Sequence, residues 1–252
     1  MAQLKSIASF LDRELKLSSF TDESNNGLQV ENSGKVRKIC AGVDASLEFF
    51  EKAAEKKADL LICHHGISWG NSLKKITGLN YLKLKFLIEK DAALYACHLP
   101  LDAHPEYGNN ALICRALGLK ALKPFGCEHG AKVGFSGNLP KAESYSEFKK
   151  RARSLFGDLT AAMDFGKSRV KTAAVVSGGG AGEIESAARA GIDVFITGEP
   201  GLSAYNLARE YGINAIFGGH YATEVFGVRK IAEILENKFS VKAEFIDLGI
   251  SL

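Results

Sequence analysis

Residues 59–66 read DLLICHHG, an apolar run that ends in two adjacent histidines and a glycine. A short apolar run of this length is typical of a buried strand. Within a regular strand His64 and His65 would face opposite sides of the sheet. At the last residues of a strand the backbone already turns, and Gly66 permits conformations that other residues avoid. We therefore expect both imidazoles to reach one pocket; the alternative is one core histidine bonded to the backbone and one exposed histidine.

Apolar runs and helical patterns alternate along the rest of the chain. The expected strands are 38–44, 59–65, 92–98, 170–178, 193–199, 214–220 and 241–249. The expected helices are 1–16, 46–57, 80–90, 108–118, 144–157, 181–191, 202–212 and 221–239. This rhythm indicates right-handed βαβ units, so the fold class is α/β with mostly parallel sheets flanked by helices.

A stretch rich in glycine and proline at 123–140, KPFGCEHGAKVGFSGNLP, marks a domain transition. We expect two interlinked α/β domains. The first comprises 1–124 with 220–252 and carries most of the metal ligands, because the last helix and strand return to it. The second comprises 125–219.

Composition excludes several classes of protein. The chain has 252 residues, 26 of them glycine, and a charged fraction of 24%, as in ordinary globular α/β proteins. The N-terminal stretch lacks a secretory or membrane-spanning pattern, so we expect a cytoplasmic protein with no membrane partner. A net charge of +3 argues against nucleic acid as a partner. Five cysteines without a C-x-x-C pair indicate free thiols.

Histidines gather at the carboxyl ends of the expected strands, where parallel α/β sheets bind ligands. Four of the six histidines lie there: His64, His65, His98 and His220. Because Cys63 and Cys97 directly precede such histidines, strand alternation turns their thiols to the opposite face. A site at this edge would therefore offer nitrogen and oxygen ligands.

Two carboxylates accompany these imidazoles. Glu224 follows His220 by four residues at the start of a helix, so both lie on one face, as in metal-binding helices. An ordinary first helical turn, in which Glu224 favours the helix dipole, is the alternative. Asp102 lies between Pro100 and Pro105, which predict a rigid extended arm; an Asx turn or a helix cap is the alternative there.

Together His64, His65, Asp102, His220 and Glu224 offer three imidazoles and two carboxylates, more than one tetrahedral zinc site needs. This set suits two divalent ions that share a water or hydroxide. It does not choose among zinc, iron, manganese and nickel. Two dications against two carboxylates leave positive charge, so we expect a small anionic ligand.

Seven short stretches give the chain a resemblance to a known family. They are NGLQVE (26–31), GVDAS (42–46), ICHHGISW (62–69), HLPLDAH (98–104), SGGGAG (177–182), DVFITGE (193–199) and GHYATE (219–224). In this order they resemble the Nif-three-like family of dinuclear-metal hexameric proteins, also named as type II homologues of GTP cyclohydrolase one.

The resemblance implies a Nif-three-like fold, a toroidal homohexamer and two ions per subunit, with Glu224 bridging them. It implies a role for His98 in binding substrate or transferring protons. The SGGGAG stretch could cradle an anion with its amides, or it could serve only tight packing of strand against helix.

Three functions follow from these expectations. The first is a metal-dependent hydrolase, GTP cyclohydrolase-like, that acts on a nucleotide or another small anion, with His98 or Glu199 moving a proton. The second is a non-enzymatic protein that handles or inserts metal, or a regulatory scaffold. The third, a ring around nucleic acid, is disfavoured by the modest net charge.

Overall fold

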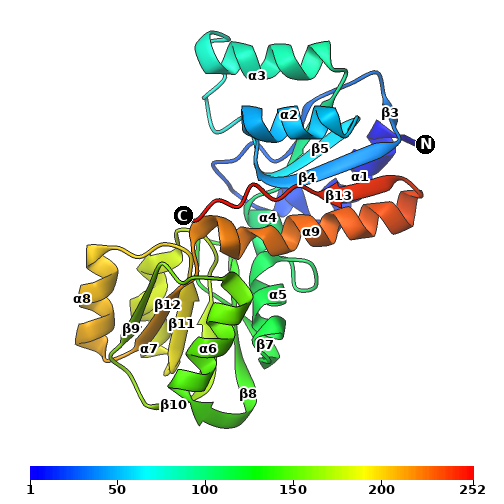
Figure 1. The fold of residues 1–252 in the computed structure, drawn as a ribbon. Helices are drawn as coiled ribbons and strands as arrows, with labels where there is room; N and C mark the ends of the chain where they lie inside the picture. The colour runs from blue at the N-terminus through cyan, green and yellow to red at the C-terminus, as the bar shows by residue number, and fades with distance from the viewer. The chain divides into compact units, whose positions relative to one another are not determined.

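The computed structural model describes residues 1–252 and divides into two compact units (Figure 1). Unit 1 comprises Met1–Leu101 and Gly227–Gly249, and unit 2 comprises Asp102–Phe226 and Ile250–Leu252. Residues 102–124 and 220–226, which the sequence analysis grouped with the first domain, are in unit 2. Three of the candidate metal ligands, Asp102, His220 and Glu224, consequently belong to unit 2.

Unit 1 is built on a five-stranded sheet with the order β13-β4-β5-β6-β2. The strands are β2 (Gly27–Val30), β4 (Lys38–Asp44), β5 (Leu60–His65), β6 (Ala93–Ala96) and β13 (Lys242–Phe245). Only β2 is antiparallel to its neighbour, so the expected mostly parallel arrangement is found here. A small antiparallel pair, β1 (Ala2–Gln3) and β3 (Lys35–Val36), lies outside this sheet.

Four helical segments lie within unit 1 and precede the C-terminal helix. They are α1 (Leu4–Glu14), the short 3-10 helix η1 (Leu17–Ser19), α2 (Leu47–Glu55) and α3 (Gly78–Glu89). Ser46 caps α2 by accepting a hydrogen bond from the backbone N–H of Phe49. Phe49 and Phe50 are fully buried in a core that also contains Cys63 and Leu94 from the sheet. The apolar spacing that predicted α1 and α2 therefore marks their buried faces, whereas Leu87 is the only buried residue of α3.

The C-terminal strand joins the sheet of unit 1, as the sequence analysis expected. Helix α9 (His220–Phe239) begins in unit 2 and continues into unit 1, and β13 then pairs in parallel with β4 (Figure 1). The Lys38 ammonium lies 2.6 Å from the Glu244 carboxylate across this pair. No helix combines the length and the apolar character that crossing a bilayer would need.

Unit 2 contains a six-stranded sheet with the order β7-β8-β10-β11-β12-β9. The strands are β7 (Lys120–Phe125), β8 (Gly134–Ser144), β9 (Ala161–Asp164), β10 (Arg169–Val175), β11 (Val194–Thr197) and β12 (Asn214–Phe217). Only β10, β11 and β12 run parallel to one another, so the parallel character of the fold is partial. The sequence analysis missed β7, β8 and β9. Glycine, proline and lysine residues make β7 and β8 resemble loops, and β9 is only four residues long, with two alanines and an aspartate that disfavour strands.

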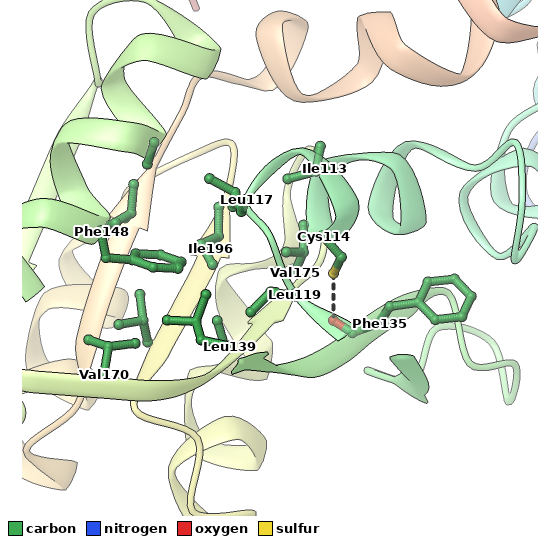
Figure 2. Close-up of a cluster of buried hydrophobic side chains, with 14 of the residues drawn as sticks. Ile113, Cys114, Leu117, Leu119, Phe135, Leu139, Phe148, Val170, Val175 and Ile196 are labelled. Carbon is green, nitrogen blue, oxygen red and sulfur yellow. Dashed lines mark hydrogen bonds between the residues drawn. The ribbon is translucent and has the colours of Figure 1, made fainter. Parts of the chain in front are cut away.

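The core of unit 2 lies between this sheet and its helices. The helices are α5 (Asn109–Ala116), α6 (Tyr145–Phe156), the 3-10 helix η2 (Gly180–Glu183), α7 (Ile184–Arg189) and α8 (Leu202–Tyr211). Figure 2 shows Phe148 of α6 beside Ile196 of β11, with Ile113 and Leu117 from the α5 region in the same cluster. The cluster fixes the strands whose ends carry the candidate ligands of unit 2.

We predict that Phe148→Ala lowers the free energy of unfolding by about 3–5 kcal/mol, because the removed ring leaves a cavity in this core. Urea unfolding followed by far-UV circular dichroism measures the change. Leu202→Ala, at a side chain that is 80% exposed, is the control and should shift the free energy by less than about 0.5 kcal/mol. Equal effects of the two substitutions would contradict this account of the core.

Candidate metal centre

His64 and His65 end β5, and both rings turn to the same place. Their centroids are 4.7 Å apart with planes inclined at 51°. His64 is buried and His65 is partly exposed. The two adjacent rings therefore lie together, as expected, while His64 also bonds to the backbone carbonyl of Cys97 from a buried position, as the alternative expected.

Position 66 requires glycine because there is no space for a side chain, and not because of the backbone freedom that the sequence analysis suggested. Its backbone does not adopt a left-handed conformation. A Cβ there would lie 2.3 Å from the Gln29 side-chain oxygen and 2.6 Å from the Cβ of Ala96. That Gln29 oxygen accepts hydrogen bonds from the backbone N–H groups of Ile67, at 2.8 Å, and Ser68, at 3.2 Å. Glycine therefore makes room for the side chain that fixes the loop after the histidines.

His98, after β6, completes a cluster of three imidazoles. Its ring centroid lies 5.1 Å from that of His64 and 5.5 Å from that of His65. One potential ligand atom of each of the three lies within 4.8 Å of the others. Trp69 packs against this imidazole cluster, with its ring centroid 5.1 Å from His98 and 5.7 Å from His65. Unit 1 thus brings together nitrogen donors that could hold a metal ion.

Each imidazole of the cluster has its Nδ1 beside an oxygen. The oxygens are the Cys97 carbonyl at 2.9 Å from His64, an Asp44 carboxylate oxygen at 2.8 Å from His65 and an Asp22 carboxylate oxygen at 2.9 Å from His98. Because carbonyl and carboxylate oxygens accept hydrogen bonds, each Nδ1 carries the hydrogen. The lone pair of each neutral ring is then on Nε2, the arrangement that metal-binding histidines show.

Asp22, which the sequence analysis did not single out, is the carboxylate behind His98. Its side chain is only 3% exposed. It also accepts hydrogen bonds from the Asn26 amide at 2.8 Å and from the backbone N–H groups of Ser24, at 3.0 Å, and Leu99, at 3.1 Å. Burial alone would raise the pKa of Asp22, but the hydrogen bond and charge of His98, with the other donors, lower it to about 2. Asp22 is therefore an anion at neutral pH.

The thiols near the cluster do not join it. None of the five cysteines forms a disulfide, and Cys63 is buried in the core of unit 1. Burial raises the pKa of the Cys63 thiol well above its ordinary value. The groups of side chains that could hold a metal contain no cysteine, which agrees with the expected nitrogen and oxygen site.

Asp102 lies at the end of a single helical turn, α4 (Leu99–Asp102), where the sequence analysis expected an extended arm. That expectation was wrong because Pro100 stands at the start of the turn, where a helix needs no N–H donor. The buried Asp102 carboxylate accepts hydrogen bonds from the Asn109 amide at 2.8 Å and the Ser177 hydroxyl at 3.1 Å. Both donors belong to unit 2 and fix this carboxylate beside the loop after β10.

His220 and Glu224 pair across the first turn of α9, as their spacing predicted. The His220 Nε2 lies 3.1 Å from a Glu224 carboxylate oxygen, and its Nδ1 lies 2.6 Å from a Glu199 oxygen. The hydrogen bond to Glu224 raises the pKa of His220; burial opposes this, and Glu199 adds to it, so the pKa is about 9. His220 is thus an imidazolium between two carboxylates at neutral pH. Glu199, for which a proton-transfer role was expected, contacts the ring directly.

The SGGGAG loop packs against this pair. Gly178 has φ +62°, and a Cβ there would lie 2.4 Å from the Glu224 oxygen and 3.0 Å from the His220 Nε2. Its N–H donates to the Thr223 hydroxyl at 3.0 Å, and its carbonyl accepts from the N–H of Gly198 at 2.9 Å. These contacts favour close packing of loop and helix over an anion cradle as the role of the glycines.

We predict that Gly178→Ala displaces Glu224 and costs about 1–3 kcal/mol of stability, because alanine is strained at this φ and its Cβ meets the carboxylate. The pKa of His220 should fall toward its ordinary value, which NMR titration of the histidine ring measures. Gly182→Ala is the matched control, since nothing lies within 4 Å of its Cβ position. An unchanged His220 pKa in the Gly178 variant would contradict this geometry.

The raised pKa of His220 predicts a pH dependence for the metal-free chain. A group whose pKa rises on folding stabilises the folded state fully below its unfolded pKa of 6.5, and this contribution is lost as the pH rises through about 9. We expect a loss of about 2 kcal/mol between these limits, after allowing for partial exposure. Urea unfolding at several pH values tests this, and Glu224→Gln should flatten the profile.

Comparison with known proteins shows the relationships of the chain. The family model described as Duf34/NIF3 (NGG1p interacting factor 3) matches residues 2–249. A Deinococcus radiodurans protein named GTP cyclohydrolase 1 type 2 homolog is 44% identical over 243 residues, which cover 96% of this chain and 92% of the relative. A protein of the same name from Archaeoglobus fulgidus is 43% identical over 249 residues, which are 99% of each chain.

A solved structure shows the same fold. The protein TTHA1606 from Thermus thermophilus superposes with a TM-score of 0.91 and 37% identity, and the match covers 100% of both chains. The agreement extends over both units, and the sequence match covers nearly every residue from 2 to 249. The chain therefore belongs to the Duf34/NIF3 family.

Proposed function

We propose that the chain is a metal-dependent hydrolase that binds two divalent ions and acts on a nucleotide or another small anionic substrate. The proposed ligands are His64 and His65 from unit 1 and Asp102, His220 and Glu224 from unit 2. The observation that carries the proposal is the hydrogen bonding of the imidazoles, whose Nδ1 atoms all lie beside oxygens. With Nδ1 held in this way, each ring could offer Nε2 to a metal, and the oxygen partner makes the ring more basic.

The donor chemistry of unit 2 supports the same proposal. In the metal-free chain the proton on the Nε2 of His220 occupies the place beside the buried Glu224 carboxylate. A divalent cation could replace that proton, with His220 and Glu224 as ligands and Glu199 still holding the Nδ1. Asp102, held by Asn109 and Ser177, supplies a second fixed carboxylate.

The charge of the proposed centre favours an anionic substrate. Two dications facing the carboxylates of Asp102 and Glu224 leave a surplus of about two positive charges. The relatives named GTP cyclohydrolase 1 type 2 homolog supply the more specific proposal of a guanine nucleotide that is opened by hydrolysis. The ions would lower the pKa of a bound water and polarise the attacked atom.

His98 and Glu199 are proposed as the groups that move protons. The buried, ionised Asp22 holds the Nδ1 of His98, so Nε2 is the atom at which His98 would accept or release a proton. The Asp22 charge would also stabilise the imidazolium that forms, as in other acid–base pairs of aspartate and histidine. Glu199 is 57% exposed and can exchange protons with solvent.

A homohexamer is the proposed assembly. Helix α3 exposes an apolar surface that a lone chain would not need: Leu79, Tyr81, Leu82 and Ile88 are all exposed, and Leu87 is the only buried residue of this helix. An exposed apolar surface of this kind is typical of a protein contact. Its position on unit 1 supports contact between chains without identifying the copy number.

The proposal predicts two ions per chain when the purified protein is loaded with zinc, iron, manganese or nickel and analysed for metal content, with light scattering to count chains. His65→Ala and Glu224→Gln should each lose at least one ion and reduce metal-dependent turnover of nucleotides by more than about 100-fold. His129→Ala, at a histidine outside both ligand sets, is the control and should keep both ions.

Three outcomes separate the functions. Binding of no ion, or equal metal content in all variants, would remove the metal centre. Two tightly held ions without turnover of any nucleotide would remove the hydrolase and leave a structural or regulatory centre. Rapid transfer of the ions to an apo acceptor would favour the alternative of a metal-handling protein.

A further inference from the structure

We propose that unit 1 contains a complete binding site for one transition-metal ion, in which His64, His65 and His98 are all ligands and Asp22 is the positioning residue for His98. This inference deepens the proposed function, because it makes His98 a ligand whenever the ligands of unit 2 are not engaged. It also predicts that one ion binds without any carboxylate ligand. The occupant is a borderline divalent ion such as Zn²⁺, Co²⁺ or Ni²⁺, since imidazole suits these ions better than Ca²⁺ or Mg²⁺.

The geometry of the three rings fits one central ion. The ring centroids are 4.7, 5.1 and 5.5 Å apart, and the planes are inclined to each other at 51°, 58° and 55°. One potential ligand atom of each ring lies within 4.8 Å of those of the other two rings, which is close enough for one ion to reach all three. Three imidazoles on one side of an ion leave a fourth position open for water or substrate.

Three different oxygens select the same tautomer in all three rings. His64 donates its Nδ1–H to a backbone carbonyl, and His65 and His98 donate theirs to the carboxylates of Asp44 and Asp22. With the hydrogen on Nδ1, each neutral ring of the cluster has its lone pair on Nε2. The two outer carboxylates carry two negative charges behind the ligands, which balance one dication.

His98 is held by hydrogen bonds at both its backbone and its ring. Its backbone N–H donates to the Asn26 side-chain oxygen at 2.7 Å, and the amide of the same Asn26 donates to Asp22 at 2.8 Å. Asp22 therefore receives four hydrogen bonds, one of them from His98, and its carboxylate cannot rotate away. Such fixed outer partners preorganise a ligand before the ion arrives.

Trp69 makes the proposed site observable. It is the only tryptophan in the chain, its ring lies against His65 and His98, and its Nε1–H donates to the Gly66 carbonyl at 2.9 Å. A paramagnetic ion such as Co²⁺ bound by the imidazole cluster should quench its fluorescence. The visible spectrum of bound Co²⁺ reports the ligand number independently.

The test uses the full chain with the ligands of unit 2 removed by the combined substitutions Asp102→Asn, His220→Gln and Glu224→Gln. We expect this triple variant to bind one Co²⁺ per chain, with quenching of Trp69 and the absorption of a four-coordinate ion. Adding His98→Ala should weaken Co²⁺ binding by at least about 100-fold, and adding Asp22→Asn by about 10- to 100-fold. Circular dichroism confirms that each variant is folded.

Asp12→Asn in the same background is the matched control. Asp12 is also a carboxylate of unit 1 that accepts a hydrogen bond, from the Tyr95 hydroxyl at 2.8 Å, but it contacts no ring of the cluster. Its substitution should leave Co²⁺ affinity unchanged. An effect equal to that of Asp22→Asn would show general destabilisation and overturn the positioning role.

The inference and the proposed function fail differently. If the unsubstituted chain binds two ions and the folded triple variant binds none, unit 1 has no site of its own and the inference is overturned while the five-ligand centre stands. If His98→Ala leaves the affinity of the triple variant unchanged, His98 is not a ligand. If the unsubstituted chain binds no ion at all, both proposals fall.

Discussion

The hydrogen bond from an imidazole Nδ1 to a fixed oxygen is the interaction on which the candidate site depends. It occurs at His64, His65 and His98 in unit 1 and at His220 in unit 2. Each bond fixes the orientation of its ring, and in the rings of unit 1 it also leaves Nε2 as the nitrogen with the lone pair when the ring is neutral. Without these bonds the four side chains would be ordinary polar residues near the ends of strands.

The candidate ligands of the two units differ in their chemistry. In unit 1 the candidate ligands are imidazoles, and the carboxylates of Asp22 and Asp44 lie beside the Nδ1 atoms of His98 and His65. Unit 2 offers carboxylates directly, with His220 protonated between Glu224 and Glu199 while no ion is present. Binding of a cation at His220 would therefore release the proton that its Nε2 shares with Glu224.

Close packing explains the glycines of the motifs better than backbone freedom or anion binding does. At Gly66 a side chain would collide with Gln29, and at Gly178 it would collide with Glu224. In both places the missing Cβ makes room for a polar side chain. At Gly66 this is Gln29, which fixes the loop after the histidines, and at Gly178 it is the candidate ligand Glu224 itself. The motifs ICHHGISW and SGGGAG therefore describe packing around the site as much as the site itself.

The sequence by itself determined the features that depend on local periodicity. These are the α/β class, the convergence of His64 and His65 and the pairing of His220 with Glu224. Only the tertiary structure decided the antiparallel strands of unit 2, the helical turn at Asp102 and the role of Asp22. The hydrogen bond from His98 to Asp22 joins residues 76 positions apart, and no periodic pattern encodes a contact at that separation. Local spacing sets which way neighbouring side chains point, whereas folding of distant segments sets which oxygen each imidazole meets.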